Sequence, residues 1–139
     1  MELGDARTIA PTSGLTGPRL RRQIEVPAVA GTYDQVVPQL VERRHALGLT
    51  QADLDARVGW ADGYAGKVEV PPGTPGRRRP KSWATFTAWM QALDVALVLS
   101  PLPPGAPTVP DQGGQAEHPI DATLRTLKPL RLGVAVVAR

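Results

Sequence analysis

Proline and glycine confine regular structure to a few stretches of this chain. The 139 residues include 15 Pro and 14 Gly, and both types are unfavourable in the interior of a helix. Residues 70–80 contain four Pro and two Gly, so this segment cannot be helical. Residues 101–118 contain five Pro and three Gly, which is typical of a linker. The sequence therefore predicts one folded domain with a single core, flanked by extended or disordered tails.

The domain organisation follows from the positions of these breaks. Residues 1–32 mix Gly, Pro, Thr and Arg without a sustained period, and only residues 23–26 alternate as in a strand. Beyond the linker, one or two helical turns are expected at 121–127 and a final strand at 130–137. The predicted units are a flexible arm (1–32), a folded domain (33–100), a linker (101–118) and a C-terminal segment (119–139).

The composition excludes several classes of protein. The chain has no Cys, which excludes disulfides, thiol catalysis and zinc–thiolate sites. It has no stretch near the roughly 20 apolar residues of a membrane span and no signal-peptide core at its N-terminus, so we expect a cytoplasmic protein. The two histidines, His45 and His118, have no neighbours at catalytic spacing. We therefore expect no enzymatic activity, no metal and no cofactor.

Two helices joined by a short turn are predicted at the start of the domain. The first begins near Asp34, a favourable N-cap residue, and ends at Gly48, which can form a left-handed cap. The second follows a capping box of Thr50 and Asp53 and stops at Gly59. The first helix has one mostly apolar face, whose residues recur at steps of three and four. These residues are Val36, Val37, Leu40, Val41, Arg44 and Leu47.

Two further helices and a strand complete the predicted domain. A short third helix is expected from Asp62 to Glu69, and a fourth begins after Ser82. Residues 95–99 are apolar, rich in β-formers and too short for a helix, so they are expected to form a strand. The residues expected on the core face of the fourth helix are Trp83, Phe86, Met90 and Leu93.

A string of residues at fixed spacing runs from the first helix to the third. It reads Arg44-His45-Ala46-Leu47-Gly48-Leu49-Thr50-Gln51-Ala52-Asp53-Leu54, continues with Val58-Gly59 and ends with Lys67-Val68-Glu69. This string resembles the helix-turn-helix of the phage-repressor and Cro family, also called the xenobiotic-response-element (XRE) type. The resemblance implies a mainly α, four-helix lambda-repressor-like domain followed by a short strand. It also implies a sequence-specific transcriptional regulator, preferably a repressor, that binds double-stranded DNA.

The resemblance implies which residues contact DNA. The third helix is similar to a recognition helix, with Asp62, Gly63, Tyr64 and Lys67 on its outer side. Lys67 can donate to guanine or phosphate, and Tyr64 can contact a sugar or a thymine methyl. Asp62 can accept from cytosine N4, but we expect it rather to cap the helix. In the family, a glutamine at the place of Gln51 helps to hold the DNA backbone at the start of the second helix.

A basic run between the third and fourth helices adds candidate phosphate ligands. Residues 33–100 carry eight Lys or Arg and seven Asp or Glu, so a phosphate-binding surface must be local. In the family this segment follows the DNA backbone, whereas the alternative is a solvated run of charges. The residues concerned are Arg77, Arg78, Arg79 and Lys81.

The resemblance also implies a structural ion pair, and the chain departs from the family at two places. Arg44 and Glu69 occupy positions that form a partly buried ion pair in family members, although both could instead be solvated surface charges. Asp55 stands where the family usually has alanine, so its carboxylate must find a partner or tilt outward. The loop at 70–81 is longer than usual, which makes its arginines less well positioned to contact DNA.

The strand expected at 95–99 points to an oligomer. It stands where many repressors have a fifth helix, and in this it resembles antitoxins of the HipB type, whose strands pair across the dimer axis. A lone apolar strand needs a partner, either its twin in a second subunit or residues 130–137 of the same chain. We expect a homodimer that binds a palindromic operator.

Two other functions stay open. As the antitoxin of a toxin–antitoxin pair, the chain would autoregulate through the helix-turn-helix and wrap a toxin with residues 101–139, which would fold on contact. As an adaptor, the chain would have the same fold but would not bind DNA. This alternative is favoured by the near-neutral charge of the domain and by two carboxylates near the third helix, Asp55 and Asp62.

Overall fold

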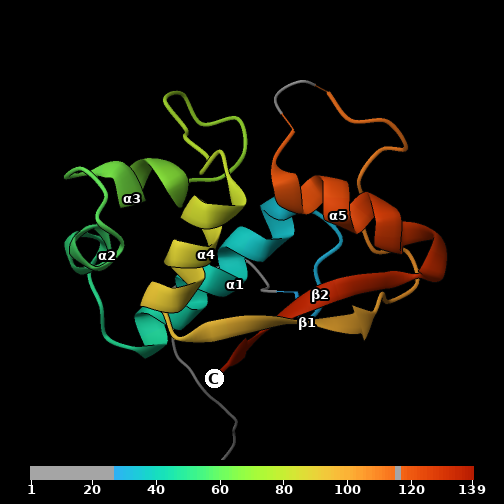
Figure 1. Ribbon diagram of the computed structural model, residues 1–139, viewed down its shortest axis with the longest axis horizontal. Coiled ribbons are helices and arrows are strands. Elements are labelled where there is room, and N and C mark those ends of the chain that lie inside the picture. Colours follow the sequence, from blue (N-terminus) through green and yellow to red (C-terminus); the bar gives the residue numbers. More distant parts are fainter. Residues whose placement is uncertain (1–26, 115–116) are drawn as a thin grey trace, which may run out of the picture.

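A computed structural model describes residues 27–114 and 117–139 (Figure 1). Within these ranges the fold is a mixture of five α-helices and one small two-stranded sheet. The elements are α1 (Tyr33–Ala46), α2 (Gln51–Val58), α3 (Tyr64–Val68), α4 (Trp83–Ala92), β1 (Val95–Pro101), α5 (Pro119–Leu127), a 3₁₀ turn (Lys128–Leu130) and β2 (Leu132–Ala138). None of the described helices has the length and apolar character needed to cross a membrane. Most of the expected arm, with the strand expected at 23–26, lies outside the described residues.

Local capping sets the start of the first two helices. Thr50 Oγ1 accepts from the Asp53 N–H at 3.0 Å, and the Asp53 carboxylate accepts from the Thr50 N–H at 2.9 Å. The predicted capping box of α2 is therefore confirmed. The N-cap expected at Asp34 is wrong, because Thr32 caps α1 by accepting from the Gln35 N–H, and Asp34 lies inside the first turn.

The α3 helix is shorter than predicted and is capped by a residue of another helix. It spans Tyr64–Val68 instead of 62–69, and its N-cap residue Gly63 has a left-handed φ of 85° and no capping side chain. The cap expected from Asp62 is therefore wrong. The Asp55 carboxylate of α2 takes this role, since it accepts from the Gly63 N–H at 2.9 Å and from the Ala65 N–H at 2.8 Å.

The α4 helix supplies the aromatic centre of the core. Phe86, Trp89 and Leu93 are fully buried, and the rings of Phe86 and Trp89 meet edge to face at 6.0 Å between centroids. The predicted core face is correct for Phe86 and Leu93 and wrong for Trp83, which is 43% exposed. Met90 is half-buried beside the core. The predicted apolar stripe runs through Trp83, Phe86 and Met90, and the observed one runs through Phe86, Trp89 and Leu93. Both step by three and four residues, so periodicity alone cannot choose between them.

The two strands of the sheet pair within the chain. β1 and β2 are antiparallel, with Val95 opposite Ala138 and Pro101 opposite Leu132. Of the two partners open to the predicted strand, the structure contains the one from the same chain. The outer edge of β1 pairs with no strand among the described residues.

The C-terminal segment packs onto the helices and does not stand apart from them (Figure 1). Ile120 and Leu124 of α5 belong to the same buried cluster as Tyr33 of α1. Tyr33 donates its backbone N–H to the Asp121 carboxylate at 2.8 Å. Val109, within the expected linker, is 3% exposed. The α5 helix therefore lies next to the start of α1, which brings residues 117–118 close to the basic loop between α3 and α4.

Candidate nucleic-acid interface

A groove of about 830 Å³ lies between α3, the loop that leads to α4 and the turn before α5. Five cationic side chains line it, together with one carboxylate, that of Glu117, which pairs with Arg125. The groove brings together most of the residues predicted to contact DNA, and Gln51, Asp62 and Gly63 lie outside its lining. The predicted residues that line it are Tyr64, Lys67, Arg77, Arg78, Arg79 and Lys81.

The α3 helix has one buried and one exposed side. Ala65 and Val68 are fully buried against the core, whereas Lys67 is exposed. Asp62 and Gly63, just before the helix, are also exposed. The half-buried Tyr64 ring packs against Trp60, with 5.0 Å between centroids. An exposed lysine and a half-buried tyrosine thus stand on the side of α3 that faces the groove.

Gln51, the first residue of α2, extends its side chain toward α3. Its Nε2 donates to Glu69 Oε1 at 3.0 Å, and its Oε1 would lie 3.2 Å from a Cβ at Gly66. A Cβ at Gly66 would therefore crowd the end of the Gln51 side chain slightly, so α3 and the start of α2 approach closely here. Gln51 is exposed, as a residue that contacts a DNA phosphate must be, but its amide is already engaged within the protein.

The predicted ion pair between Arg44 and Glu69 is present and buried. Arg44 Nε lies 2.7 Å from Glu69 Oε2, and a second guanidinium nitrogen donates to Oε1 at 2.9 Å. A third Arg44 nitrogen donates to the Leu49 carbonyl at 2.7 Å. Arg44 is 7% exposed. This two-bond pair ties α1 to the end of α3, and loss of one partner would leave a buried charge at a cost of about 3–5 kcal/mol.

The residues of the basic loop differ in their surroundings. Arg77 pairs with Asp34 at 2.6 Å, and its guanidinium lies over the Tyr33 ring at 5.7 Å. Arg79 also lies over the Tyr33 ring, at 5.5 Å. Arg78 and Lys81 are exposed. The sequence alone gave no reason to distinguish the four cations, but in the structure only Arg78 and Lys81 among them are exposed.

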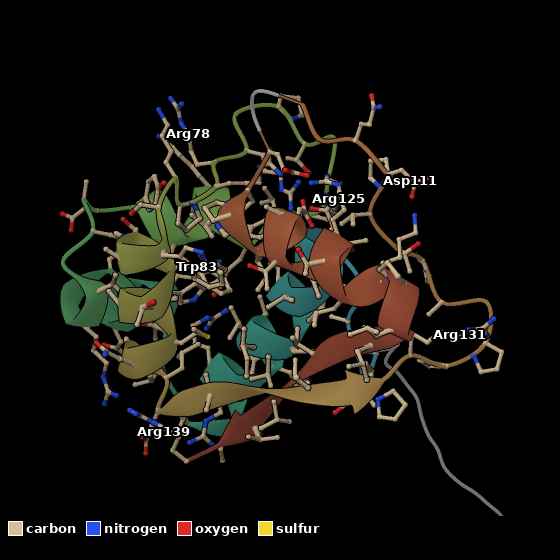
Figure 2. All side chains as sticks on the ribbon, turned by 45° about the vertical axis from the view of Figure 1, so that its right-hand side comes forward. Arg78, Trp83, Asp111, Arg125, Arg131 and Arg139 are labelled. Carbon is tan, nitrogen blue, oxygen red and sulfur yellow. The ribbon has the colours of Figure 1, made fainter. Side chains whose placement is uncertain are left out.

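A backbone hydrogen bond positions the loop relative to α3. The Arg78 N–H donates to the Lys67 carbonyl at 2.9 Å, so the long loop returns to the end of α3. Figure 2 shows the Arg78 side chain projecting from the top of the molecule, away from Arg131 and Arg139. The cations of α3 and of the loop therefore belong to one surface despite the length of the loop.

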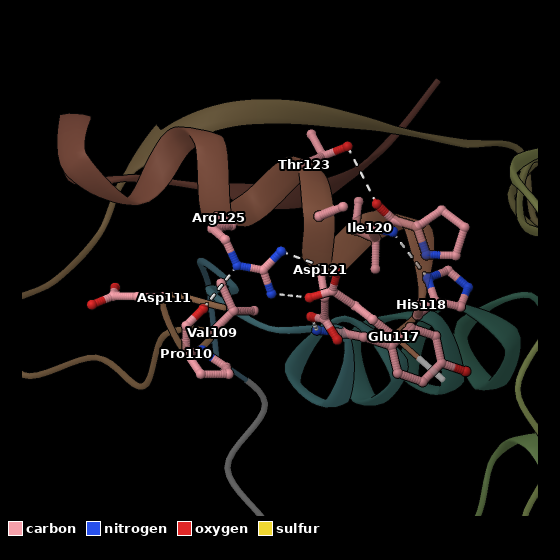
Figure 3. Close-up of polar contacts among 12 residues, drawn as sticks. Val109, Pro110, Asp111, Glu117, His118, Ile120, Asp121, Thr123 and Arg125 are labelled. Carbon is pink, nitrogen blue, oxygen red and sulfur yellow. Dashed lines mark hydrogen bonds and ion pairs between the residues drawn. The ribbon is translucent and has the colours of Figure 1, made fainter. Parts of the chain in front are cut away.

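His118 is a residue of the groove that the sequence analysis placed in a flexible linker. It is 2% exposed, and its ring lies 4.3 Å from that of Tyr33. Its Nδ1 accepts from the Ile120 N–H at 3.1 Å, which caps α5 (Figure 3). Burial, and to a smaller extent the charge of Arg79, lower the pKa of His118 to about 4, against the opposing effect of a hydrogen bond to the Pro80 backbone. The ring is therefore neutral near pH 7.

Two further residues of this region were not foreseen. Burial raises the pKa of the Tyr33 hydroxyl well above its usual value, so the group stays protonated. Glu117 pairs with Arg125 of α5, and Arg125 also donates to the Pro110 carbonyl at 2.9 Å (Figure 3). The pattern His118-Pro119, followed by apolar residues at helical spacing, was a local signal for a capped helix. Nothing in the sequence indicated that this helix would pack beside Tyr33.

Comparison with protein-family models, curated proteins and solved structures finds no match for this chain.

Proposed function

We propose that this chain is a sequence-specific regulator of transcription that binds double-stranded DNA, with α2 and α3 as a helix-turn-helix. In this proposal α3 lies in the major groove, where Lys67 and Tyr64 contact base edges or sugars. Arg78 and Lys81 bind phosphates of the adjoining backbone. Of the two kinds of regulator, repressor and activator, we propose a repressor.

One observation carries the proposal: the exposed side of α3 and the cations of the following loop line the same groove. A protein that recognises a sequence in duplex DNA needs such an arrangement. Phosphate contacts position the protein, while a neighbouring element reaches the bases. The two structural supports of α3, the Arg44–Glu69 pair and the Asp55 cap, act on the side of the helix away from solvent. Asp55 is thus occupied within the fold and no longer favours an adaptor role.

In this proposal, the dimer expected from the sequence forms at the outer edge of β1, which pairs with no strand of residues 27–114 and 117–139. Val98 and Leu99 are 41% and 60% exposed on this strand. Antiparallel pairing of two β1 edges would satisfy the backbone groups of that edge and extend the sheet across a two-fold axis, with the Val98 and Leu99 side chains on its opposite faces next to those of the second copy. Two recognition helices would then contact half-sites about one helical turn apart. Light scattering should give twice the mass of the chain, and Leu99→Lys should shift it toward the monomer.

The decisive experiment is the salt dependence of binding to the DNA upstream of the protein's own gene, measured by fluorescence anisotropy. Each phosphate contact contributes about 0.9 to the slope of log K against log salt. The double variant Arg78→Gln/Lys81→Gln should therefore flatten the slope by about two units. Its matched control, Arg131→Gln/Arg139→Gln, removes the same charge far from the groove and should leave the slope nearly unchanged.

Three outcomes would contradict the proposal. These are no binding to duplex DNA, equal slopes for the wild type and the groove variant, or an equal loss of slope in the matched control. Lys67→Gln adds a test of specificity, because it should reduce the preference for the upstream DNA over unrelated DNA.

The antitoxin role is the second candidate, and no observation raises it above the first. It required residues 101–139 to be free to fold on a toxin. In the structure Val109, Ile120 and Leu124 are buried in the protein's own core.

A further inference from the structure

The end of the loop between α3 and α4 directs its side chains alternately inward and outward. Arg77 and Arg79 are half-buried and Pro80 is fully buried, whereas Arg78 and Lys81 are exposed. This stretch belongs to no helix or strand of the described chain. Side-chain contacts must therefore fix which of its cations face solvent.

The first turn of α1 supplies these contacts through Tyr33 and Asp34. Arg77 pairs with the Asp34 carboxylate at 2.6 Å, and its guanidinium carbon lies 5.7 Å from the centre of the Tyr33 ring. The Arg79 guanidinium lies over the same ring at 5.5 Å. A cation at this distance is attracted to the face of an aromatic ring. The two arginines that flank Arg78 in the sequence are thus both held against α1.

The Tyr33 ring is itself held in place by α4 and α5. It is fully buried, with its centre 4.3 Å from that of the His118 ring and 6.5 Å from that of Phe86. The Tyr33 backbone N–H donates to the Asp121 carboxylate of α5 at 2.8 Å. His118 also has a hydrogen bond to the Pro80 backbone. The loop therefore rests on a fixed surface that α1 and α5 form together.

We propose that Asp34 is a positioning residue for DNA binding that acts through Arg77. Held at Arg77, the loop keeps Arg78 and Lys81 directed toward solvent, where a phosphate backbone can reach them. A loop without this anchor would be ordered only on binding, and such ordering costs free energy. This inference rests on the proposed function, in which Arg78 and Lys81 bind phosphates.

The sign of the effect of Asp34→Asn on affinity for the upstream DNA tests the proposal. If the carboxylate acted only through space, its removal near a polyanion would raise the affinity. Loss of the anchor should instead lower the affinity roughly two- to fivefold, the factor by which a partly exposed ion pair shifts an equilibrium. Asp34→Glu keeps the carboxylate and should retain most of the affinity.

Glu42→Gln is the matched control for the lost charge. Glu42 is an exposed carboxylate of the same helix, about two turns beyond Asp34. Its replacement removes one negative charge without touching the anchor, so it should not lower the affinity for DNA.

A double-mutant cycle checks that Asp34 acts through Arg77. Arg77→Met keeps an apolar side chain that can pack against the Tyr33 ring and removes the partner of the Asp34 carboxylate. In this background Asp34→Asn should no longer lower the affinity. A loss of the same size in both backgrounds would overturn the route through Arg77.

Limited digestion with trypsin, which cleaves after Arg and Lys, follows the loop in the absence of DNA. Cleavage after Arg78 reports how often the loop opens. Asp34→Asn should be cleaved there roughly two- to fivefold faster than the wild type, and Glu42→Gln at the wild-type rate.

The two measurements distinguish failure of this inference from failure of the proposed function. An affinity of Asp34→Asn equal to or above that of the wild type overturns the positioning role. Equal cleavage of Asp34→Asn and the wild type overturns the anchor itself. If the protein binds no duplex DNA, the proposed function fails, and faster cleavage of Asp34→Asn would still show that Asp34 anchors the loop.

Discussion

Asp55 allows a quantitative test of how α3 is held. Its buried carboxylate, 3% exposed, accepts two backbone N–H groups at the start of α3, those of Gly63 and Ala65. Asp55→Ala removes both acceptors and leaves the two donors unsatisfied. The Ala65 N–H is buried and costs about 1–3 kcal/mol when unsatisfied. Gly63 is exposed, so its lost bond is comparable to the loss of an N-cap, about 0.5–2 kcal/mol. The free energy of unfolding should therefore fall by about 1.5–5 kcal/mol. This is a large share of the roughly 5–15 kcal/mol by which a small domain is stable.

Urea unfolding followed by tryptophan fluorescence measures the loss, because Trp60 packs against Tyr64 of α3. The matched control is Asp62→Ala, which removes an exposed carboxylate seven positions further on and should cost less than about 0.5 kcal/mol. Asp55→Asn keeps one acceptor and should fall between the two. Equal losses for Asp55→Ala and Asp62→Ala would refute the assignment of Asp55 as the group that holds α3.

Two further changes test the core and the buried histidine. Trp89→Ala should destabilise the protein by about 3–5 kcal/mol and Trp83→Ala by less than about 1 kcal/mol; urea unfolding of both variants checks this, and equal losses would contradict the buried stripe of α4. Because the pKa of His118 falls from 6.5 to about 4 on folding, the unfolded chain binds more protons between these values. The stability that depends on the neutral ring is therefore complete above about pH 6.5 and lost as the pH falls toward about 4. His118→Asn should remove this part of the pH dependence of urea unfolding, and identical pH profiles would contradict it.

Caps and turns were predictable because they depend on residues a few positions apart. The capping box of Thr50 and Asp53, the cap of α4 at Ser82 and the left-handed Gly59 all follow from local hydrogen bonds and backbone preferences. The strand after α4 was foreseen for the same reason, since it follows from a short run of β-formers between two turn signals.

Periodicity was a weaker guide where a helix has apolar residues on more than one side. In α4 both Trp83 and Trp89 fit a stripe that passes through Phe86, and only packing against the other helices buries Trp89. The start of α1 was misplaced because Thr32 and Asp34 are both good N-cap residues. Which of them caps depends on the path of the preceding chain, where Ala30 pairs with Val134 of β2.

The sequence by itself determined which residues could form helices and which segments must be loops, because proline, glycine and capping side chains act over a few bonds. It also indicated which residues carry the charge of the candidate interface. Only the tertiary structure decided how these parts meet. Asp55 caps a different helix, Arg77 pairs with Asp34 across 43 positions, and Tyr33 binds Asp121 across 88. Contacts at such separation depend on how whole elements pack, and no local pattern encodes them.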